Sequence, residues 1–130
     1  MPGSFTLGKK ERLKSRKSIE LLFREGKGFT IAPFRVYYAK HNAGEPALQF
    51  GAGVSSRHFK KAADRNRVKR LMREAWRLQK TALQQKLAEQ NSGLNVFCIY
   101  TARELPVYQQ VYGSICRVLD KLLTINTPVK

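Results

Sequence analysis

The sequence predicts an α+β protein, a two-layer α/β sandwich in the order α-β-β-(β)-α-β-α. Three observations predict it: a long basic segment with helical apolar spacing, short stretches of strand composition, and a C-terminal apolar helix pattern. The 130 residues, 42% of them hydrophobic, suit one domain with a packed core. We expect a single domain over 1–130, with a basic arm at 1–15 and a tail at 124–130.

The first elements are a short helix and a strand. A helix is predicted over Ser18–Glu25, because serine is a favoured N-cap and Gly26 suits a helix end. Because Gly26 and Gly28 are close together, the segment that follows this helix is expected to be loosely structured. Phe34–Ala39 has the aromatic and β-branched content of a strand, and Asn42–Pro46 is rich in turn formers.

A second strand is predicted over Leu48–Ser55, with apolar residues on one face and Gly51 and Gly53 on the other. Two readings of the glycine face stay open. Small residues there leave a shallow surface that a ligand backbone approaches closely, or they mark a twisted strand packed under a helix.

A long helix is predicted to begin between Ser56 and Asp64 and to run to about Glu89, before a stop at Asn91–Gly93. At about 100° per residue its apolar side chains gather on one side and its basic ones on the other. The apolar side holds Val68, Leu71, Met72, Ala75 and Leu78, and the opposite side holds Asn66, Lys69, Arg70, Arg73 and Arg77.

The C-terminal part predicts a strand and a helix. Asn95–Thr101 is a nearly continuous apolar run, as in a strand buried on both faces, and Pro106 suits the first turn of a last helix. The core face of that helix is expected to comprise Val107, Val111, Ile115, Val118, Leu119 and Leu122. Cys98 and Cys116 are expected to be reduced core residues, in agreement with a cytoplasmic protein.

The charge balance indicates a polyanionic partner. There are 25 Lys and Arg against 9 Asp and Glu, a formal net charge of +16, which makes nucleic acid the leading candidate. An anionic membrane is the main rival, but no stretch is long and apolar enough to span one. Residues 1–17 lack the apolar region of a signal peptide.

The sequence contains little that supports catalysis by the chain itself. Asp64 and Glu74 are ten residues apart, about 15 Å along a helix, too far for a carboxylate pair. No hydrolase, zinc-protease or phosphate-loop motif is present, and the two cysteines lack zinc-site spacing. His41 and His58 have no nearby partner in the sequence. We therefore expect no catalytic and no metal-ligating residues.

Binding is better supported. The interval 57–77 holds nine Lys or Arg with little interleaved Glu, so its positive side chains repel one another. Binding of a polyanionic partner would relieve this repulsion. The amide of Asn66 suits base edges or a 2′-hydroxyl. Phe23, Phe34, Tyr37 and Tyr38 are candidates to border a cleft for single-stranded nucleic acid. Strand alternation turns Tyr37 and Tyr38 to opposite faces, so about two of these four rings are expected in the core.

The basic motif resembles a known family. The run Arg65-Asn66-Arg67-Val68-Lys69-Arg70-Leu71-Met72-Arg73-Glu74 is similar to the signature of the bacterial ribonuclease P protein component. Upstream, Arg12-Leu13-Lys14, Phe23, Gly26, Phe34 and Gly51–Ser55 also stand at the family's places. The resemblance covers about Leu7 to Leu123.

The resemblance implies a fold and a function. The fold is like the second domain of ribosomal protein S5, with a left-handed βαβ crossover. The function is that of the noncatalytic protein subunit of a ribozyme whose RNA subunit removes the 5′ leader of precursor tRNA. Mg²⁺ would be held mainly by the RNA subunit and substrate. The partners would be the RNA subunit, in a 1:1 complex, and precursor tRNA, in the cytoplasm and without a membrane.

The resemblance also implies roles for particular residues. Contacts to the RNA subunit would come from Arg65, Asn66, Arg67, Lys69, Arg70 and Arg73. The leader would lie in a cleft between the first helix and the sheet, with Phe23, Phe34, Tyr37, Arg57, Lys60 and Lys61. Two positions depart from the family pattern: Ser56 stands where a basic residue is common, and Ile19 where an aromatic one is common.

Two other classes of RNA- or DNA-binding protein share some of these features. A ribosomal protein or RNA chaperone would share the charge but would not discriminate the leader. A helix-turn-helix DNA binder needs a short helix and a tight turn before its recognition helix, and the predicted strand Leu48–Ser55 occupies that place.

Overall fold

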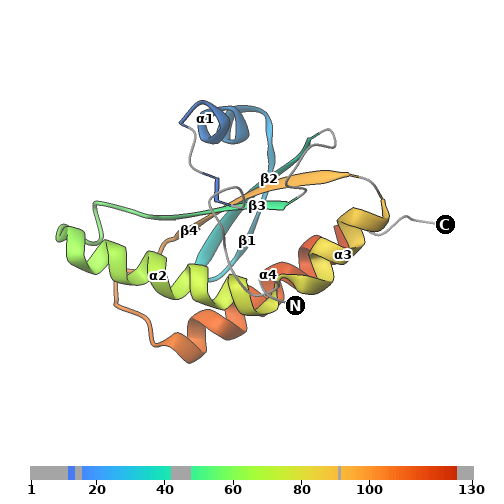
Figure 1. The fold of residues 1–130 in the computed structure, drawn as a ribbon. Coiled ribbons are helices and arrows are strands. Elements are labelled where there is room, and N and C mark those ends of the chain that lie inside the picture. Colours follow the sequence, from blue (N-terminus) through green and yellow to red (C-terminus); the bar gives the residue numbers. More distant parts are fainter. Residues whose placement is uncertain (1–11, 14–15, 42–47, 91, 126–130) are drawn as a thin grey trace.

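The computed structural model describes residues 12–13, 16–41, 48–90 and 92–125. The elements, in chain order, are α1 (Arg16–Glu25), β1 (Lys27–Ile31), β2 (Phe34–His41), β3 (Leu48–Val54), α2 (Ala62–Gln79), α3 (Thr81–Glu89), β4 (Gly93–Tyr100) and α4 (Tyr108–Ile125). Figure 1 shows one sheet with α1 on one side of it and α2 and α4 on the other. This is the mixed α+β class that the sequence predicts.

The four strands form a single sheet in the order β1-β2-β4-β3. β1 pairs with β2, and β2 with β4, in antiparallel fashion, whereas β3 and β4 are parallel neighbours. The parallel pair requires a crossover, which α2 and α3 supply. The left-handed sense of this crossover stays a prediction.

The core lies between the sheet and the helices α2, α3 and α4. Each strand sends alternate side chains into it, as a strand's two-residue period requires, and Phe50 of β3 stacks on Trp76 of α2 at a centroid distance of 4.2 Å. Both rings are almost fully buried. We call this side of the sheet the helix face.

The opposite side, the open face, carries α1 over part of its surface. One row across the sheet pairs Gly28 with Tyr37, Tyr37 with Phe97 and Phe97 with Gly51. A Cβ atom built on Gly51 would lie 2.5 Å from Cδ1 of Phe97, and one on Gly53 would lie 2.8 Å from its Cε2. The glycines therefore make room for the Phe97 ring, which neither sequence reading had foreseen.

Several predicted elements are confirmed, and others need correction. β1 is a strand where the sequence indicated a loose segment, since Phe29 and Ile31 pack against the core. The long helix divides at Lys80, and Figure 1 shows α3 changing direction after α2. The predicted turn at 42–46, most of the arm at 1–15 and residues 126–130 of the tail lie outside the described residues.

Burial corrects four further expectations. Val107 is 60% exposed because α4 begins one residue later, and Leu78 is 39% exposed at the end of α2. Cys116 is exposed, since it lies about 130° around α4 from the centre of the buried stripe, whereas Cys98 is buried as expected. β4 is not buried on both faces: Phe97 and Ile99, on the open face, are only partly covered.

Candidate nucleic-acid interface

The polar side of α2 borders a basic hollow of about 460 Å³. Its lining residues are Arg12, Asn66, Arg70, Arg73, Glu74 and Arg77. Five of them come from α2, at positions that recur every three or four residues and so share one side of the helix. Arg12 comes from outside the helix, from a residue that forms a parallel bridge with Phe50 of β3. The hollow therefore joins the helix to the edge of the sheet.

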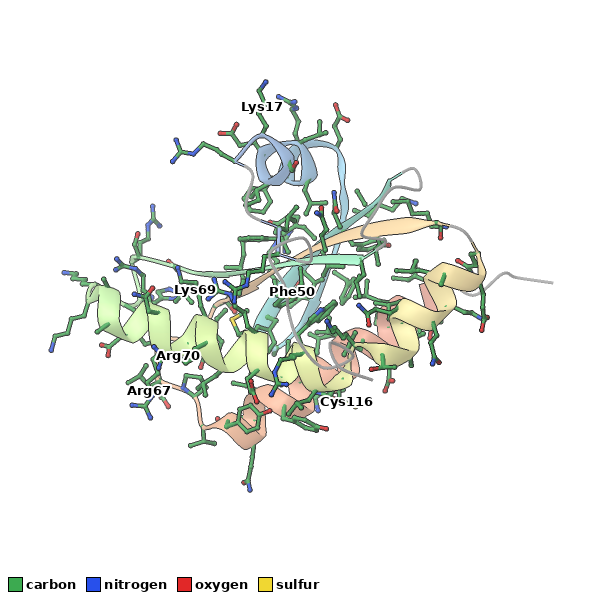
Figure 2. All side chains as sticks on the ribbon, in the orientation of Figure 1. Lys17, Phe50, Arg67, Lys69, Arg70 and Cys116 are labelled. Atoms are coloured by element: carbon green, nitrogen blue, oxygen red, sulfur yellow. The ribbon has the colours of Figure 1, made fainter. Side chains whose placement is uncertain are left out.

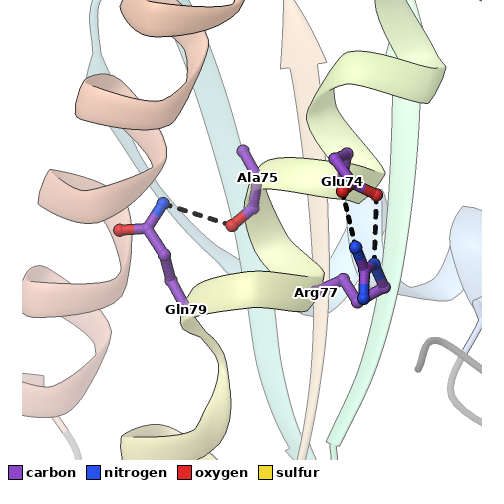
Figure 3. A network of polar contacts seen from close by, with 4 residues as sticks. All are labelled: Glu74, Ala75, Arg77 and Gln79. Atoms are coloured by element: carbon purple, nitrogen blue, oxygen red, sulfur yellow. Dashed lines mark hydrogen bonds and ion pairs between the residues drawn. The ribbon is translucent and has the colours of Figure 1, made fainter. Parts of the chain in front are cut away.

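The electrostatics of the hollow favour an anion. Partial burial, and then the charge of Arg12 in the same hollow, lowers the pKa of the Arg73 guanidinium. The Glu74 carboxylate accepts two hydrogen bonds from Arg77, at 3.0 Å from Nε and 2.5 Å from Nη2. Figure 3 shows this forked pair. The lining holds four guanidinium groups and one carboxylate, a composition suited to phosphate.

The six residues expected to bind an RNA subunit are not all brought together. Asn66, Arg70 and Arg73 line the hollow, whereas Arg65, Arg67 and Lys69 do not. Figure 2 shows Lys69 on the sheet side of α2 and Arg67 on the opposite side.

Arg65 has a structural role. Its Nη1 donates to the carbonyl oxygens of Phe59 at 2.7 Å and of Lys60 at 2.9 Å. These bonds tie the loop before α2 to the first turns of that helix. Part of the hydrogen-bonding capacity of the Arg65 guanidinium is thus directed at the protein itself.

A second candidate surface is an aromatic cluster on the open face, formed by Phe23 of α1, Tyr37 of β2 and Phe97 of β4. The centroid of the Phe23 ring lies 4.8 Å from that of Tyr37, with the two rings tilted, and 5.4 Å from that of Phe97, with the two rings edge-on. Phe23 is 43% exposed. Nε of Arg35 donates to the Tyr37 hydroxyl at 2.7 Å, and the Arg35 guanidinium carbon lies 5.3 Å from the ring centroid. Rings and a cation thus lie together at the surface.

Phe34 does not belong to this cluster, so its assignment to the cleft is wrong. It is fully buried on the helix face, where its ring packs 5.8 Å from that of Tyr100. The reason is strand alternation: Phe34 and Val36 point to one face of β2, and Arg35 and Tyr37 to the other.

The remaining cleft candidates, Arg57, Lys60 and Lys61, are exposed on the loop between β3 and α2. Turns at Ser55 shape this loop: its carbonyl accepts from the amides of His58 and Phe59, and its hydroxyl accepts from that of Arg57. The loop leaves the carboxyl end of β3, and its first cation, Arg57, lies three residues beyond the strand that carries Gly51 and Gly53.

Sequence reasoning missed three basic or aromatic members of the two surfaces. Arg77 was predicted on the basic side of the helix but not among the residues that contact RNA. Its helical spacing from Arg70 and Arg73 would have been enough to include it. Phe97 had been hidden in an apolar run, and only the pairing of β4 turns it to the open face. For Arg12, no pattern within the sequence places it beside α2.

Neither a metal site nor a membrane span is found within the described residues. No group of three or more His, Cys, Asp or Glu side chains there is placed to hold a metal ion. Among the helices of the described chain, none has the length and apolar character needed to cross a bilayer.

Comparison with known sequences identifies the family. A model of the family described as "Ribonuclease P" matches residues 7–124. A protein of Porphyromonas gingivalis named "Ribonuclease P protein component" is 38% identical over 124 residues, covering 93% of this chain and 89% of the relative. A protein of the same name from Chlorobium phaeobacteroides is 37% identical over 82 residues, covering 60% of this chain and 56% of the relative.

Solved structures show the same fold. The RNase P protein from Thermotoga maritima superposes with a TM-score of 0.66 at 25% identity, covering 85% of this chain and 96% of that one. The Staphylococcus aureus RNase P protein superposes with a TM-score of 0.67 at 18% identity, covering 92% and 100%. Fold, basic motif and sequence similarity agree along most of the chain, which therefore belongs to the ribonuclease P family.

Proposed function

We propose that this chain is the protein subunit of ribonuclease P, which assists an RNA subunit in removing the 5′ leader of precursor tRNA. The observation that carries the proposal is the basic hollow, because two of its guanidinium groups, those of Arg70 and Arg73, lie on the motif that resembles the family signature. Family membership supports the tRNA-processing function of the holoenzyme. The chain contributes binding and positioning, and the RNA subunit contributes the chemistry.

The hollow is the proposed contact with the RNA subunit. Arg70, Arg73 and Asn66 present donors from one side of α2, and Arg67 and Lys69 extend the contact around the helix. Guanidinium groups bind phosphate oxygens in pairs and stay charged at any physiological pH. Neutralising crowded phosphates in this way lowers the concentration of divalent cation that the RNA needs, since the cations and the side chains screen the same charges.

The aromatic cluster is the proposed contact with the leader. Unpaired bases stack on rings regardless of sequence, and Tyr37 is held in place by Phe23 and Arg35. Arg57, Lys60 and Lys61 would meet the leader phosphates. Because mature tRNA has no leader, this surface favours the precursor over the product.

Three further parts of the proposal rest on the family rather than on contacts. Mg²⁺ would be held mainly by the RNA subunit and substrate. The protein would bind the RNA subunit in a 1:1 ratio. The complex would work in the bacterial cytoplasm, with which the two free cysteines agree.

A cleavage assay at low Mg²⁺ tests the function. Precursor tRNA and the cognate RNA subunit are incubated with and without the protein, and the 5′ end of the product is mapped. We expect accurate cleavage only with both, and none with the protein alone. Arg70→Gln should weaken binding of the RNA subunit, while Lys86→Gln, which removes a charge from α3 outside the hollow, should leave it nearly unchanged.

A second measurement separates leader recognition from general RNA binding. Tyr37→Ala should reduce the preference for precursor over mature tRNA by roughly tenfold, the equivalent of one base–ring stack. Tyr112→Ala removes a half-exposed tyrosine from α4 and serves as the matched control. Protein that binds RNA equally well with and without a leader, and leaves cleavage unchanged, would point to a ribosomal protein or RNA chaperone instead.

A further inference from the structure

The guanidinium of Arg65 is directed back at the loop between β3 and α2. Its Nη1 donates to the carbonyl oxygen of Phe59 at 2.7 Å and to that of Lys60 at 2.9 Å. Arg65 is half-buried, whereas Arg67, the other arginine of the Arg-Asn-Arg start of the basic motif, is exposed. Two arginines of one motif thus have different surroundings, and the difference suggests different tasks.

The two hydrogen bonds hold the backbone on both sides of Lys60. The Phe59 carbonyl belongs to the peptide group before Lys60, and the Lys60 carbonyl belongs to the peptide group after it. Because peptide groups are planar, holding both of them leaves little freedom in the two backbone dihedral angles of Lys60. Those angles set the direction of its side chain, so Arg65 fixes the direction in which an exposed lysine leaves the loop.

The loop itself gives Lys60 a firm base. Phe59 is 6% exposed, and the centroid of its ring lies 6.1 Å from that of Tyr100, the last residue of β4. The Ser55 carbonyl, just beyond β3, accepts from the Phe59 amide at 3.2 Å. The backbone is therefore anchored at Phe59, and the hydrogen bonds from Arg65 connect that anchor to the first turns of α2.

The position of Arg65 opposes the electrostatics of the helix. It is the fourth residue of α2, near the positive end of the helix dipole, where a cation is unfavourable. The cations Lys60 and Lys61 immediately precede the helix and add to the repulsion. The two carbonyl oxygens offset part of this cost through charge-assisted hydrogen bonds. The stability of the helix alone therefore does not favour an arginine here.

We propose that Arg65 is a positioning residue for the leader: it holds Lys60 in the direction from which the lysine ammonium group meets a leader phosphate. The inference rests on the proposed function, which assigns Lys60 to the leader. It separates Arg65 from Arg67, whose exposed side chain is left to the RNA subunit. The Arg-Asn-Arg start of the motif thus acts on both RNA partners, on one by direct contact and on the other through the loop.

The preference of the holoenzyme for precursor over mature tRNA measures this role. Equilibrium binding of both tRNAs is measured at low Mg²⁺, with enough protein to saturate the cognate RNA subunit. Arg65→Gln should reduce the preference several-fold and leave the affinity for the RNA subunit nearly unchanged. Arg67→Gln, the matched control, should do the reverse. A substitution that merely destabilised the protein would weaken its binding to the RNA subunit and would leave the preference at saturation unchanged.

Lys60→Gln shows whether Arg65 acts through Lys60. This substitution should itself reduce the preference several-fold, through the loss of a phosphate contact. The double variant should be no worse than Lys60→Gln alone, because a misdirected lysine and an absent one lose the same contact. In the free protein, Arg65→Gln should also shift the NMR resonances of the Lys60 and Lys61 amides, since each belongs to a peptide group that loses a hydrogen bond.

The outcomes separate this inference from the function on which it rests. If Arg65→Gln weakens binding of the RNA subunit and spares the preference, or if its effect adds to that of Lys60→Gln, the positioning role is refuted and the proposed function stands. The same holds if Lys60→Gln spares the preference while Tyr37→Ala reduces it. If none of these substitutions changes the preference, the leader surface is wrong and both proposals fall. Non-additive losses of preference support the positioning role.

Discussion

Gly53→Ala tests the packing of Phe97 over the glycines of β3. An added Cβ would lie 2.8 Å from Cε2 and 3.0 Å from Cζ of the Phe97 ring, so the ring must move by several tenths of an ångström. Overpacking of this kind costs about 1–3 kcal/mol, and the reduced freedom of the unfolded chain returns about 0.4–1 kcal/mol. We expect a net loss of roughly 1–2 kcal/mol, a fall in Tm of about 4–8 °C at this chain length.

Gly113→Ala is the matched control, because it makes the same chemical change inside α4. A Cβ there meets nothing within 4 Å, so only the helix preference of alanine acts. That preference should raise stability by about 0.5–1 kcal/mol. The two substitutions are thus expected to have opposite signs in urea unfolding monitored by circular dichroism.

A double-mutant cycle with Phe97→Ala identifies the cause. With the ring removed, Gly53→Ala should become neutral or stabilising, which gives a coupling free energy of about 1–2 kcal/mol. The reasoning is refuted if Gly53→Ala is as benign as Gly113→Ala in the native background, or if its cost persists when Phe97 is alanine.

Three further predictions concern the core, the thiols and the basic hollow. Trp76→Ala should cost about 3–5 kcal/mol in urea unfolding, because the ring is fully buried and stacked on Phe50; a loss below 1 kcal/mol would contradict that burial. A thiol reagent at mildly alkaline pH should modify Cys116 rapidly in the native protein and Cys98 only after unfolding, since burial raises the pKa of the Cys98 thiol well above its usual range. Cys116→Ser should remove the rapid reaction. Rapid modification of both cysteines in the native protein would contradict the burial of Cys98. Hydrogen bonds from Arg77 lower the pKa of the Glu74 carboxyl in the folded protein. The pair therefore stabilises the folded state at pH values above the unfolded-state pKa of Glu74, and this contribution is lost as the pH falls through the folded-state pKa. The stability difference between Glu74→Gln and the native chain should therefore be present near pH 7 and shrink at acidic pH, and a difference that grows on acidification would reverse the sign we assign.

The elements that the sequence predicted well are those whose own pattern is strong. α1, β2, β3 and α4 have apolar residues at helical or strand spacing within the element, and β4 has a nearly continuous apolar run of strand length. β1 was missed because Gly28 and Lys27 weaken its local pattern, and its strand form depends on pairing with β2 and on burying Phe29 and Ile31. The division at Lys80 was missed for a similar reason, since no glycine or proline marks it.

The candidate sites were predictable to the extent that their residues share one element. The α2 side of the basic hollow follows from helical spacing, but Arg12 reaches it only through a bridge to β3. Strand alternation, applied to Phe34 as it was to Tyr37 and Tyr38, would have assigned that ring to the core. Phe97 could not be assigned to the open face before the register of β4 against β2 was known, because an apolar run hides its alternation.

The order of strands has a consequence for synthesis of the protein on the ribosome. β4 is the last strand to be made, yet it lies between β2 and β3 in the sheet. Until residues 93–100 have left the ribosome, β2 and β3 each lack a neighbour, and the apolar side chains of α2 have only part of a sheet to pack against. A nascent chain ending before β4 therefore exposes unpaired strand edges, which are prone to wrong pairing. We expect the growing chain to become resistant to proteases late and abruptly, when β4 inserts between β2 and β3.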